Sequence, residues 1–159
     1  MMNLKHALLP AMALMLAGCI GENASFEQEK ATATEPANHS VAAANEFLPP
    51  ATENGTASSG VLGELVAGED DYYVVNIDYF DTGAHTFTLT SLTDDLDMTV
   101  TDWTGVEYSS EGSGTGDEVV VVTTSGLGYF SDDKPIYVHI YGKTTAATSK
   151  FRLQMTTLD

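Results

Sequence analysis

Apolar and polar side chains alternate in one short run after another between residues 61 and 159, and this alternation limits the folds open to the chain. The apolar members of the clearest runs are Tyr73, Val75 and Ile77; Phe87 and Leu89; Leu96, Met98 and Val100; Ile136, Val138 and Ile140; and Phe151, Leu153 and Met155. Because successive side chains of a β-strand point to opposite faces of its sheet, each run would have one buried and one solvated face. No stretch of this region offers a convincing helical period. The pattern predicts an all-β fold in which antiparallel sheets pack as a β-sandwich.

The alternating runs, and the turn residues that separate them, predict seven or eight short strands. The expected strands are Val61–Val66, Asp71–Asp78, His85–Ser91, Leu96–Trp103, Glu118–Thr124, Ile136–Tyr141 and Lys150–Thr157. About 100 residues are enough for one domain with a single core. We therefore expect residues 61–159 to form a sandwich of the jelly-roll or immunoglobulin-like type, with a connectivity that the pattern leaves open.

Residues 19–60 have a different composition. They are rich in Ala, Thr, Ser, Glu, Asn, Pro and Gly, and large apolar residues are sparse. Neither a helical nor a strand period is sustained, which is typical of disorder. The segment is interpreted as a flexible low-complexity tether, and about 40 such residues would have a root-mean-square reach of roughly 35 Å.

The first twenty residues combine a thin positive end with a short apolar run. Lys5 and His6 precede the ten-residue stretch Ala7–Leu16, which is apolar apart from Pro10. A membrane-spanning helix needs about 20 apolar residues, so this run fits the central region of a signal peptide instead. An exported protein is expected.

The run Leu16-Ala17-Gly18-Cys19 resembles the lipobox of bacterial lipoproteins. The resemblance implies a signal peptide of residues 1–18 that is cleaved off, and a lipid anchor on Cys19 that holds the protein to a membrane in the cell envelope. Ile20 follows in place of the Asp that favours inner-membrane retention, which implies the outer membrane in a bacterium with two membranes. The alternative is an ordinary secretory signal that happens to contain a cysteine.

Charge and cysteine content limit the classes of partner and the kinds of chemistry open to the chain. The chain has 23 Asp and Glu against 6 Lys and Arg, a formal net charge of −17. Such a surface repels phosphate backbones, so we expect no nucleic-acid partner. The acidity suits cations or basic protein patches, or it serves solubility in a salty environment. Cys19 is the only cysteine, and its lipidation would leave no thiol for a disulfide, a zinc site or a nucleophile.

Several motifs of residues 61–159 together resemble the bacterial pre-peptidase C-terminal domain. They are Gly63-Glu64-Leu65; Gly68-Glu69-Asp70-Asp71-Tyr72-Tyr73-Val74-Val75; Asp94-Asp95-Leu96-Asp97-Met98-Thr99-Val100; Gly116-Asp117-Glu118-Val119; Ile136-Tyr137-Val138-His139-Ile140-Tyr141-Gly142; and Phe151-Arg152-Leu153-Gln154-Met155. They occur in the family's order. The resemblance implies a small, non-catalytic β-sandwich that accompanies secreted peptidases and other exported proteins. Some members bind calcium, and some bind collagen or polysaccharide.

The same resemblance implies a weak calcium site. Family members that bind calcium use a Glu-Pro-Asn-Asp stretch and acids ahead of the Tyr-Tyr pair. This chain has Glu35 and Asn38 in an interrupted version of that stretch, and it retains Asp70 and Asp71 before Tyr72. Calcium requires six to eight oxygen ligands, and the site lacks one carboxylate of the motif. The alternative is that these residues are a tether segment and two solvated turn acids, so that no cofactor binds.

Aromatic side chains are the candidates for ligand contact. Tyr137, Tyr141 and Trp103 are expected to contribute to an exposed strip of the kind that binds sugars or peptides. Tyr137 and Tyr141 share the face opposite the aliphatic stripe of their strand. The alternative is that these rings pack on the second surface of the sandwich or under loops.

No catalytic motif stands out. His85 and His139, the only histidines of residues 61–159, have no His or Cys at metal-ligand spacing and are interpreted as ordinary strand residues. The sequence favours a non-enzymatic, lipid-anchored envelope protein whose sandwich binds a protein or a polysaccharide. A purely structural envelope module is the second hypothesis, and a hydrolase, supported only by scattered acids and histidines, is the third.

Overall fold

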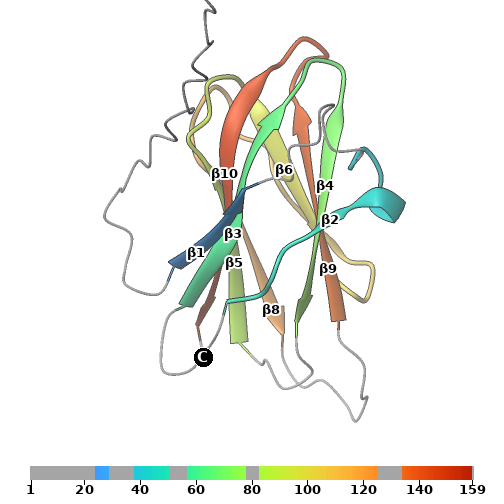
Figure 1. The fold of residues 1–159 in the computed structure, drawn as a ribbon, viewed down its shortest axis with the longest axis vertical. Helices are drawn as coiled ribbons and strands as arrows, with labels where there is room; N and C mark the ends of the chain where they lie inside the picture. Colours follow the sequence, from blue (N-terminus) through green and yellow to red (C-terminus); the bar gives the residue numbers. More distant parts are fainter. Residues whose placement is uncertain (1–23, 29–37, 51–56, 78–82, 125–133, 159) are drawn as a thin grey trace, which may run out of the picture.

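Two sheets of five strands pack face to face in the computed structural model, which describes residues 24–28, 38–50, 57–77, 83–124 and 134–158 (Figure 1). The strands are β1 (Ala24–Gln28), β2 (Asn45–Glu46), β3 (Ala57–Leu65), β4 (Asp70–Ile77), β5 (Gly83–Thr90), β6 (Leu96–Thr101), β7 (Glu107–Ser110), β8 (Glu118–Thr124), β9 (Lys134–Gly142) and β10 (Ser149–Leu158). The only helical segment in the described part of the chain is the 3-10 turn η1 (Val41–Ala43). Within those same residues, no helix has the length and the apolar character that crossing a membrane would require.

The strand order identifies the sandwich as a jelly roll. Sheet A has the order β1-β3-β10-β5-β8, and sheet B has the order β2-β4-β9-β6-β7. From β3 to β10 the chain alternates between the sheets, apart from the hairpin β6–β7, and neighbouring strands of this eight-strand part pair antiparallel. Eight strands wound in this way form the jelly-roll topology, one of the two types that the sequence left open.

The core lies between the sheets and consists of the alternating side chains that the sequence picked out. Buried residues alternate with half-buried or exposed ones along β4, β5, β8, β9 and β10. Tyr73, Phe87 and Leu153 are among the fully buried side chains, and the ring of Phe151 meets that of Tyr73 edge to face at 6.1 Å. The all-β sandwich is thus confirmed, with its inner faces as predicted.

The segment interpreted as a tether is in part built into this sandwich, which is a correction. β1 pairs in parallel with β3 at the edge of sheet A, and β2 pairs in parallel with β4 at the edge of sheet B. Phe47, directly after β2, is 1% exposed and belongs to the core, and Asn38 is fully buried. Isolated apolar residues in a polar segment show no period, so the sequence pattern could not reveal that both sheets gain an edge strand here.

One further strand escaped the sequence pattern. β7 has only four residues, and its single large side chain, Tyr108, packs against the core beside the end of β6. A carboxylate shapes the turn that leads to it. Asp102 Oδ1 accepts hydrogen bonds from the backbone N–H groups of Thr104 and Val106, at 2.8 and 3.1 Å, and Oδ2 accepts one from the Tyr108 hydroxyl at 3.4 Å. Gly105 sits in the left-handed region of this turn, with φ of 84°.

Candidate functional site

Three aromatic rings form a row on the outer face of sheet B. Tyr72 of β4 lies directly opposite His139 of β9, and Tyr141 follows two residues along β9 on the same face. The rings of Tyr72 and His139 are stacked with centroids 4.3 Å apart and planes inclined by 5°. The rings of His139 and Tyr141 lie 4.8 Å apart and are tilted by 31°. We call Tyr72, His139 and Tyr141 the aromatic row; all three side chains are half-buried and partly open to solvent.

Carboxylates hold the aromatic row in place. Asp70 Oδ2 lies 3.1 Å from His139 Nε2, and Glu111 Oε1 accepts a hydrogen bond of 3.3 Å from the Tyr141 hydroxyl. Burial, and then the nearby charge of Asp70, raises the pKa of Tyr72. Burial likewise raises the pKa of Tyr141, with further contributions from Glu111 and Asp97. Both phenols therefore stay neutral hydrogen-bonding groups at physiological pH.

The two tyrosines predicted from the sequence lie together, and the predicted tryptophan lies apart from them. Tyr137 shares the outer face of β9 with Tyr141, opposite Val74 of β4 and Thr101 of β6. Trp103 follows the end of β6, is half-buried, and packs against the hydrophobic core. Tyr137 and Tyr141 thus stand where an exposed strip was expected, whereas the indole of Trp103 does not join the aromatic row.

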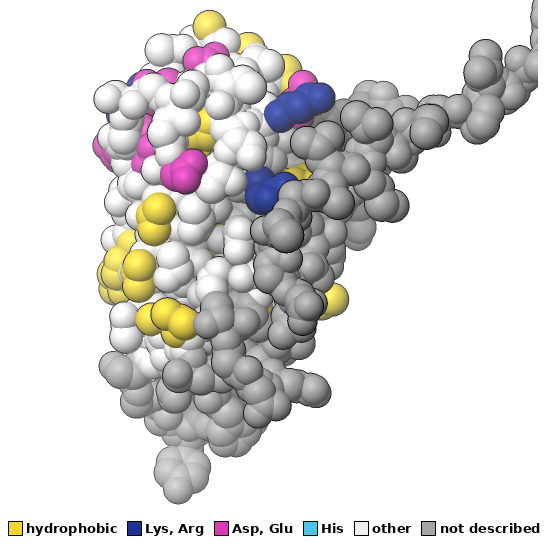
Figure 2. All heavy atoms as spheres, turned by 90° about the vertical axis from the view of Figure 1, so that its left-hand side faces the viewer, with side chains coloured by type: hydrophobic (Ala, Val, Ile, Leu, Met, Phe, Trp, Pro, Cys, Tyr) yellow, Lys and Arg dark blue, Asp and Glu magenta, His cyan; other side chains and the backbone are white. Residues whose placement is uncertain are grey.

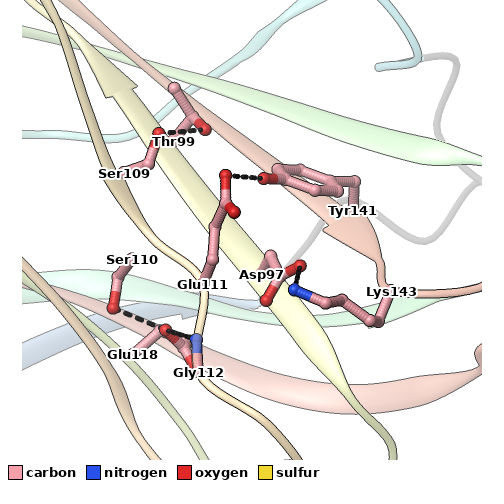
Figure 3. Close-up of polar contacts among 9 residues, drawn as sticks. All are labelled: Asp97, Thr99, Ser109, Ser110, Glu111, Gly112, Glu118, Tyr141 and Lys143. Atoms are coloured by element: carbon pink, nitrogen blue, oxygen red, sulfur yellow. Dashed lines mark hydrogen bonds and ion pairs between the residues drawn. The ribbon is translucent and has the colours of Figure 1, made fainter.

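An ion pair between a buried carboxylate and an exposed ammonium group lies beside the row (Figure 3). Asp97 is opposite Tyr141 on β6, is only 1% exposed, and its Oδ2 lies 3.1 Å from Lys143 Nζ. Burial raises the pKa of Asp97 despite the opposing effect of Lys143, and the hydrogen bond to Asp97 raises the pKa of Lys143. At neutral pH this pair contributes a compact plus–minus element to an otherwise acidic surface.

The neighbouring carboxylate of Glu118 joins the edges of the two sheets. It accepts a short hydrogen bond from Ser110 Oγ of β7, and both of its oxygens lie 3.1 Å from the backbone nitrogen of Gly112 (Figure 3). Ser110 Oγ also accepts the N–H of Val119, on the edge strand β8. A Cβ at Gly112 would come within 2.4 Å of Glu118 Oε1, so only glycine allows this closure without moving the carboxylate. These contacts support the fold around the site.

Of the four residues predicted for calcium, the structure describes Asn38, Asp70 and Asp71, and the two aspartates do not share a face of β4. Glu35 lies outside the described residues. Asp71 is 1% exposed and faces inward, Asp70 is exposed on the outer face, and Asn38 is fully buried, with its backbone carbonyl oxygen accepting the N–H of Tyr72 at 2.8 Å. Adjacent strand residues point to opposite faces, so Asp70 and Asp71 cannot bind one ion through their side chains without disturbing β4. The described residues contain no group of three or more His, Cys, Asp or Glu side chains suited to a metal ion.

His85 and His139, the two histidines of residues 61–159, occupy different sheets and different surroundings. His85 is fully buried in sheet A, with Nδ1 at 3.1 Å from Thr157 Oγ1 and Nε2 at 3.2 Å from Thr124 Oγ1. His139 lies on the opposite sheet, in the aromatic row beside Asp70. The buried imidazole is thus a core residue bonded to hydroxyl groups, and the surface imidazole is part of a stacked array.

The sequence signal for the row was incomplete. Tyr141 was expected on an outer face, but His139 was interpreted as an ordinary strand residue, because the register of β4 against β9 joins residues that are far apart in the chain. Glu111, which bonds Tyr141, lies in a polar stretch that carries no motif. Chemically, the face offers aromatic surfaces flanked by hydrogen-bond acceptors, a combination suited to binding.

Comparison with known proteins finds a likeness of structure and no match of sequence. No protein-family model matches the chain, and no curated protein matches it. Among the solved structures that resemble it is the pre-peptidase C-terminal domain of a collagenase from Bacillus anthracis, with a TM-score of 0.47 and 11% sequence identity. The match covers 69% of this chain and 91% of that chain. The sequence motifs resemble a domain of this kind, and the likeness concerns the fold alone.

Proposed function

We propose that this chain is an exported, lipid-anchored and non-catalytic protein of the cell envelope that binds a partner through the outer face of sheet B. The observation that carries the proposal is the aromatic row, in which Tyr72, His139 and Tyr141 lie side by side and partly open to solvent. Tyr137 extends the same face along β9. Stacked rings on an open sheet give a ligand a broad surface at a small cost in side-chain entropy.

The charges around the row narrow the class of ligand. The outer face of sheet B also carries Glu46, Asp70, Asp97 and Glu107, with Glu111 just beyond β7. Lys143 is engaged by Asp97. Such a face would repel a polyanion, and it suits a neutral polysaccharide, whose sugar rings stack on aromatic groups and donate hydroxyls to carboxylates, or a basic protein segment.

Export and anchoring rest on the sequence. The apolar run Ala7–Leu16 and the segment that ends in Cys19 support a cleaved signal peptide followed by a lipid. Two acyl chains would give stable attachment, since one chain binds only marginally. Replacement of Cys19 by serine should move the protein from the detergent-rich to the aqueous phase on detergent partition.

A binding role fits the two histidines better than hydrolysis does. His85 is buried among threonine hydroxyls, out of reach of a substrate. His139 is held between two phenol rings and beside Asp70, where it adds to the stacking surface. We therefore assign the domain to recognition.

The test compares two faces of the full chain. The double variant Tyr72→Ala with Tyr141→Ala should lose co-sedimentation with purified envelope polysaccharide, or cross-linking to envelope proteins, by roughly tenfold or more if each ring contributes about 1 kcal/mol. The matched control, Thr86→Ala with Thr88→Ala, alters two half-buried outer residues of sheet A and should retain binding. Equal binding by both variants would remove the recognition role from this face and favour the structural-module hypothesis.

A further inference from the structure

The anchor is close to the folded domain. β1 begins at Ala24, so residues 20–23 are all that separates Cys19 from a strand paired with β3. Even a fully extended chain covers at most about 18 Å over that separation. A lipid on Cys19 would therefore hold the sandwich next to the headgroups and would not allow the wide search expected of a 40-residue tether.

The point of attachment is on one side of the sandwich. β1 is the edge strand of sheet A, and sheet B lies in the other layer (Figure 1). The start of β1 pairs with Ser58, which in turn lies opposite Thr156 on β10. The short connection thus leaves the domain from sheet A, and this sheet is the one that a short anchor would draw toward the membrane.

The outer face of sheet A has few charges. Its registered rows are Ser58, Thr156, Thr86 and Val121; Gly60, Gln154, Thr88 and Val119; Leu62, Arg152 and Thr90; Leu158, Ala84 and Thr123; and Glu64 and Lys150. Val119 and Val121 are each 49% exposed, and Leu158 is 51% exposed. Among the described residues in Figure 2, most side chains are uncharged, with Lys and Arg right of centre and Asp and Glu mainly toward the upper left.

Charge separates this face from the opposite one. Among the outward side chains of β3, β10, β5 and β8, the charged ones are Glu64, Lys150 and Arg152, two bases against one acid. The outer face of sheet B carries acids on four of its strands. In a chain of net charge −17, sheet A is the side that an anionic headgroup surface repels least.

From the short connection and this charge asymmetry, we propose that the outer face of sheet A lies against the lipid headgroups of the membrane that holds the anchor. The proposal rests on the proposed lipidation of Cys19. Lys150 and Arg152 then face anionic headgroups, where basic side chains are favoured, and the exposed valines of β8 contact the interface. The aromatic row on sheet B is consequently turned away from the membrane, toward the partner.

The experiment uses the anchored full chain with one new thiol at a time, since an acylated Cys19 does not react. Val121→Cys places the thiol on sheet A and Ser109→Cys places a matched exposed thiol on sheet B. Each lipidated variant is reconstituted into vesicles of phosphatidylethanolamine and phosphatidylglycerol and treated with a membrane-impermeant maleimide. We expect labelling at residue 121 to be several-fold slower in vesicles than in detergent, with no change at residue 109. Equal protection of both sites, or protection of residue 109 alone, would overturn the orientation.

Three controls separate this orientation from the anchor on which it depends. The mass of the N-terminal peptide tells whether Cys19 carries lipid; an unmodified thiol would overturn the anchor and the orientation together. Insertion of a Gly-Ser linker of about 20 residues between Asn23 and Ala24, with a reach of roughly 25 Å, should reduce the protection of residue 121. Lys150→Glu should also reduce the protection of residue 121, because it replaces a base that faces anionic headgroups with an acid. A lipidated protein with equal labelling on both faces would refute the orientation alone.

Discussion

Tyr72 and His139 stack face to face across β4 and β9, with ring centroids 4.3 Å apart and planes inclined by 5°. The two residues lie in different parts of the chain, so antiparallel pairing of the two strands is what creates the contact. Asp70, close to Tyr72 in sequence, reaches over to His139 Nε2 at 3.1 Å. The candidate site is therefore a product of strand register, and its integrity can be measured without knowledge of the ligand.

The stack should contribute a measurable coupling to stability. In a double-mutant cycle of Tyr72→Ala and His139→Ala, we expect an interaction energy of about 0.5–1.5 kcal/mol in the free energy of unfolding. Urea denaturation of the four proteins provides the measurement. As a control, Tyr72 paired with Thr101, which lies on another strand of the same face, should show additive effects. Additivity at the Tyr72–His139 pair would argue against the stacked arrangement.

The two histidines should differ strongly in their importance for folding. His85→Ala removes a fully buried ring and takes hydrogen-bond partners from Thr124 and Thr157, so we expect a loss of about 3 kcal/mol. His139→Ala, at a partly solvated position, should cost about 1 kcal/mol or less. Thermal unfolding followed by circular dichroism compares the two variants. A similar cost for both would contradict the assignment of His85 to the core.

The sequence predicted the sandwich well because its strands alternate strictly. Inner residues such as Val138 and Leu153 could be named from a period of two, and β8 was found with its observed limits. Pairing was beyond reach, since nothing in a period of two says that β10 lies between β3 and β5. The aromatic row depends in the same way on the pairing of β4 with β9, and for this reason the sequence did not reveal that His139 stacks on Tyr72.

Local pattern failed where single residues decide the structure. Phe47 is one ring in a polar segment, yet it fills the core, and two residues of β2 suffice to pair with β4. Asp70 and Asp71 look alike in sequence, but the pleat of the strand sends one into solvent and the other inward. A single core residue such as Phe47, or a pair of adjacent acids, forms no periodic pattern. Only the tertiary structure shows which of these side chains is buried.

Phe47 offers a direct test of whether residues 38–50 belong to the domain. Phe47→Ala should lower the free energy of unfolding by about 3–5 kcal/mol, because it empties a site that is 1% exposed. The adjacent Leu48 is 66% exposed, so Leu48→Ala should change it by less than about 0.5 kcal/mol. Chemical denaturation of both variants gives the comparison. If Phe47→Ala were as stable as Leu48→Ala, the segment would be a tether after all.

Calcium should have little effect on stability. Asp70 and Asp71 point to opposite faces of β4, which leaves too few of the predicted ligands on one side for a six- to eight-coordinate ion. We expect the same melting temperature in millimolar CaCl₂ and in chelator, at matched ionic strength. Magnesium serves as the control for general screening of the acidic surface. A rise in melting temperature that is specific to calcium, abolished by Asp71→Asn and retained in Asp70→Asn, would instead place an ion on the inner side of β4.

The contributions of two buried aspartates to stability should depend on pH in opposite directions. Burial raises the pKa of Asp97 above its ordinary 3.8, so the stability tied to its protonation is present at low pH and is lost as pH rises through the folded-state pKa. The pKa of Asp102 is lowered: burial opposes this shift, but hydrogen bonds from Thr104, Val106 and Tyr108 outweigh it. Its contribution is present above pH 3.8 and is lost as pH falls through the lower folded-state value.

The asparagine variants convert this contrast into a measurement. Relative to the unaltered protein, Asp97→Asn should gain in melting temperature between about pH 3 and pH 7, because the native carboxylate becomes ionised in a buried position. Asp102→Asn should have a lower melting temperature over the same interval. An amide cannot replace this carboxylate, which accepts four hydrogen bonds within the turn after β6. Asp117→Asn, at an exposed loop position, is the control and should follow the unaltered protein. Parallel pH profiles for the two buried variants would show that the carboxylates do not occupy such different environments, and that the Lys143 ion pair, and not burial, governs Asp97.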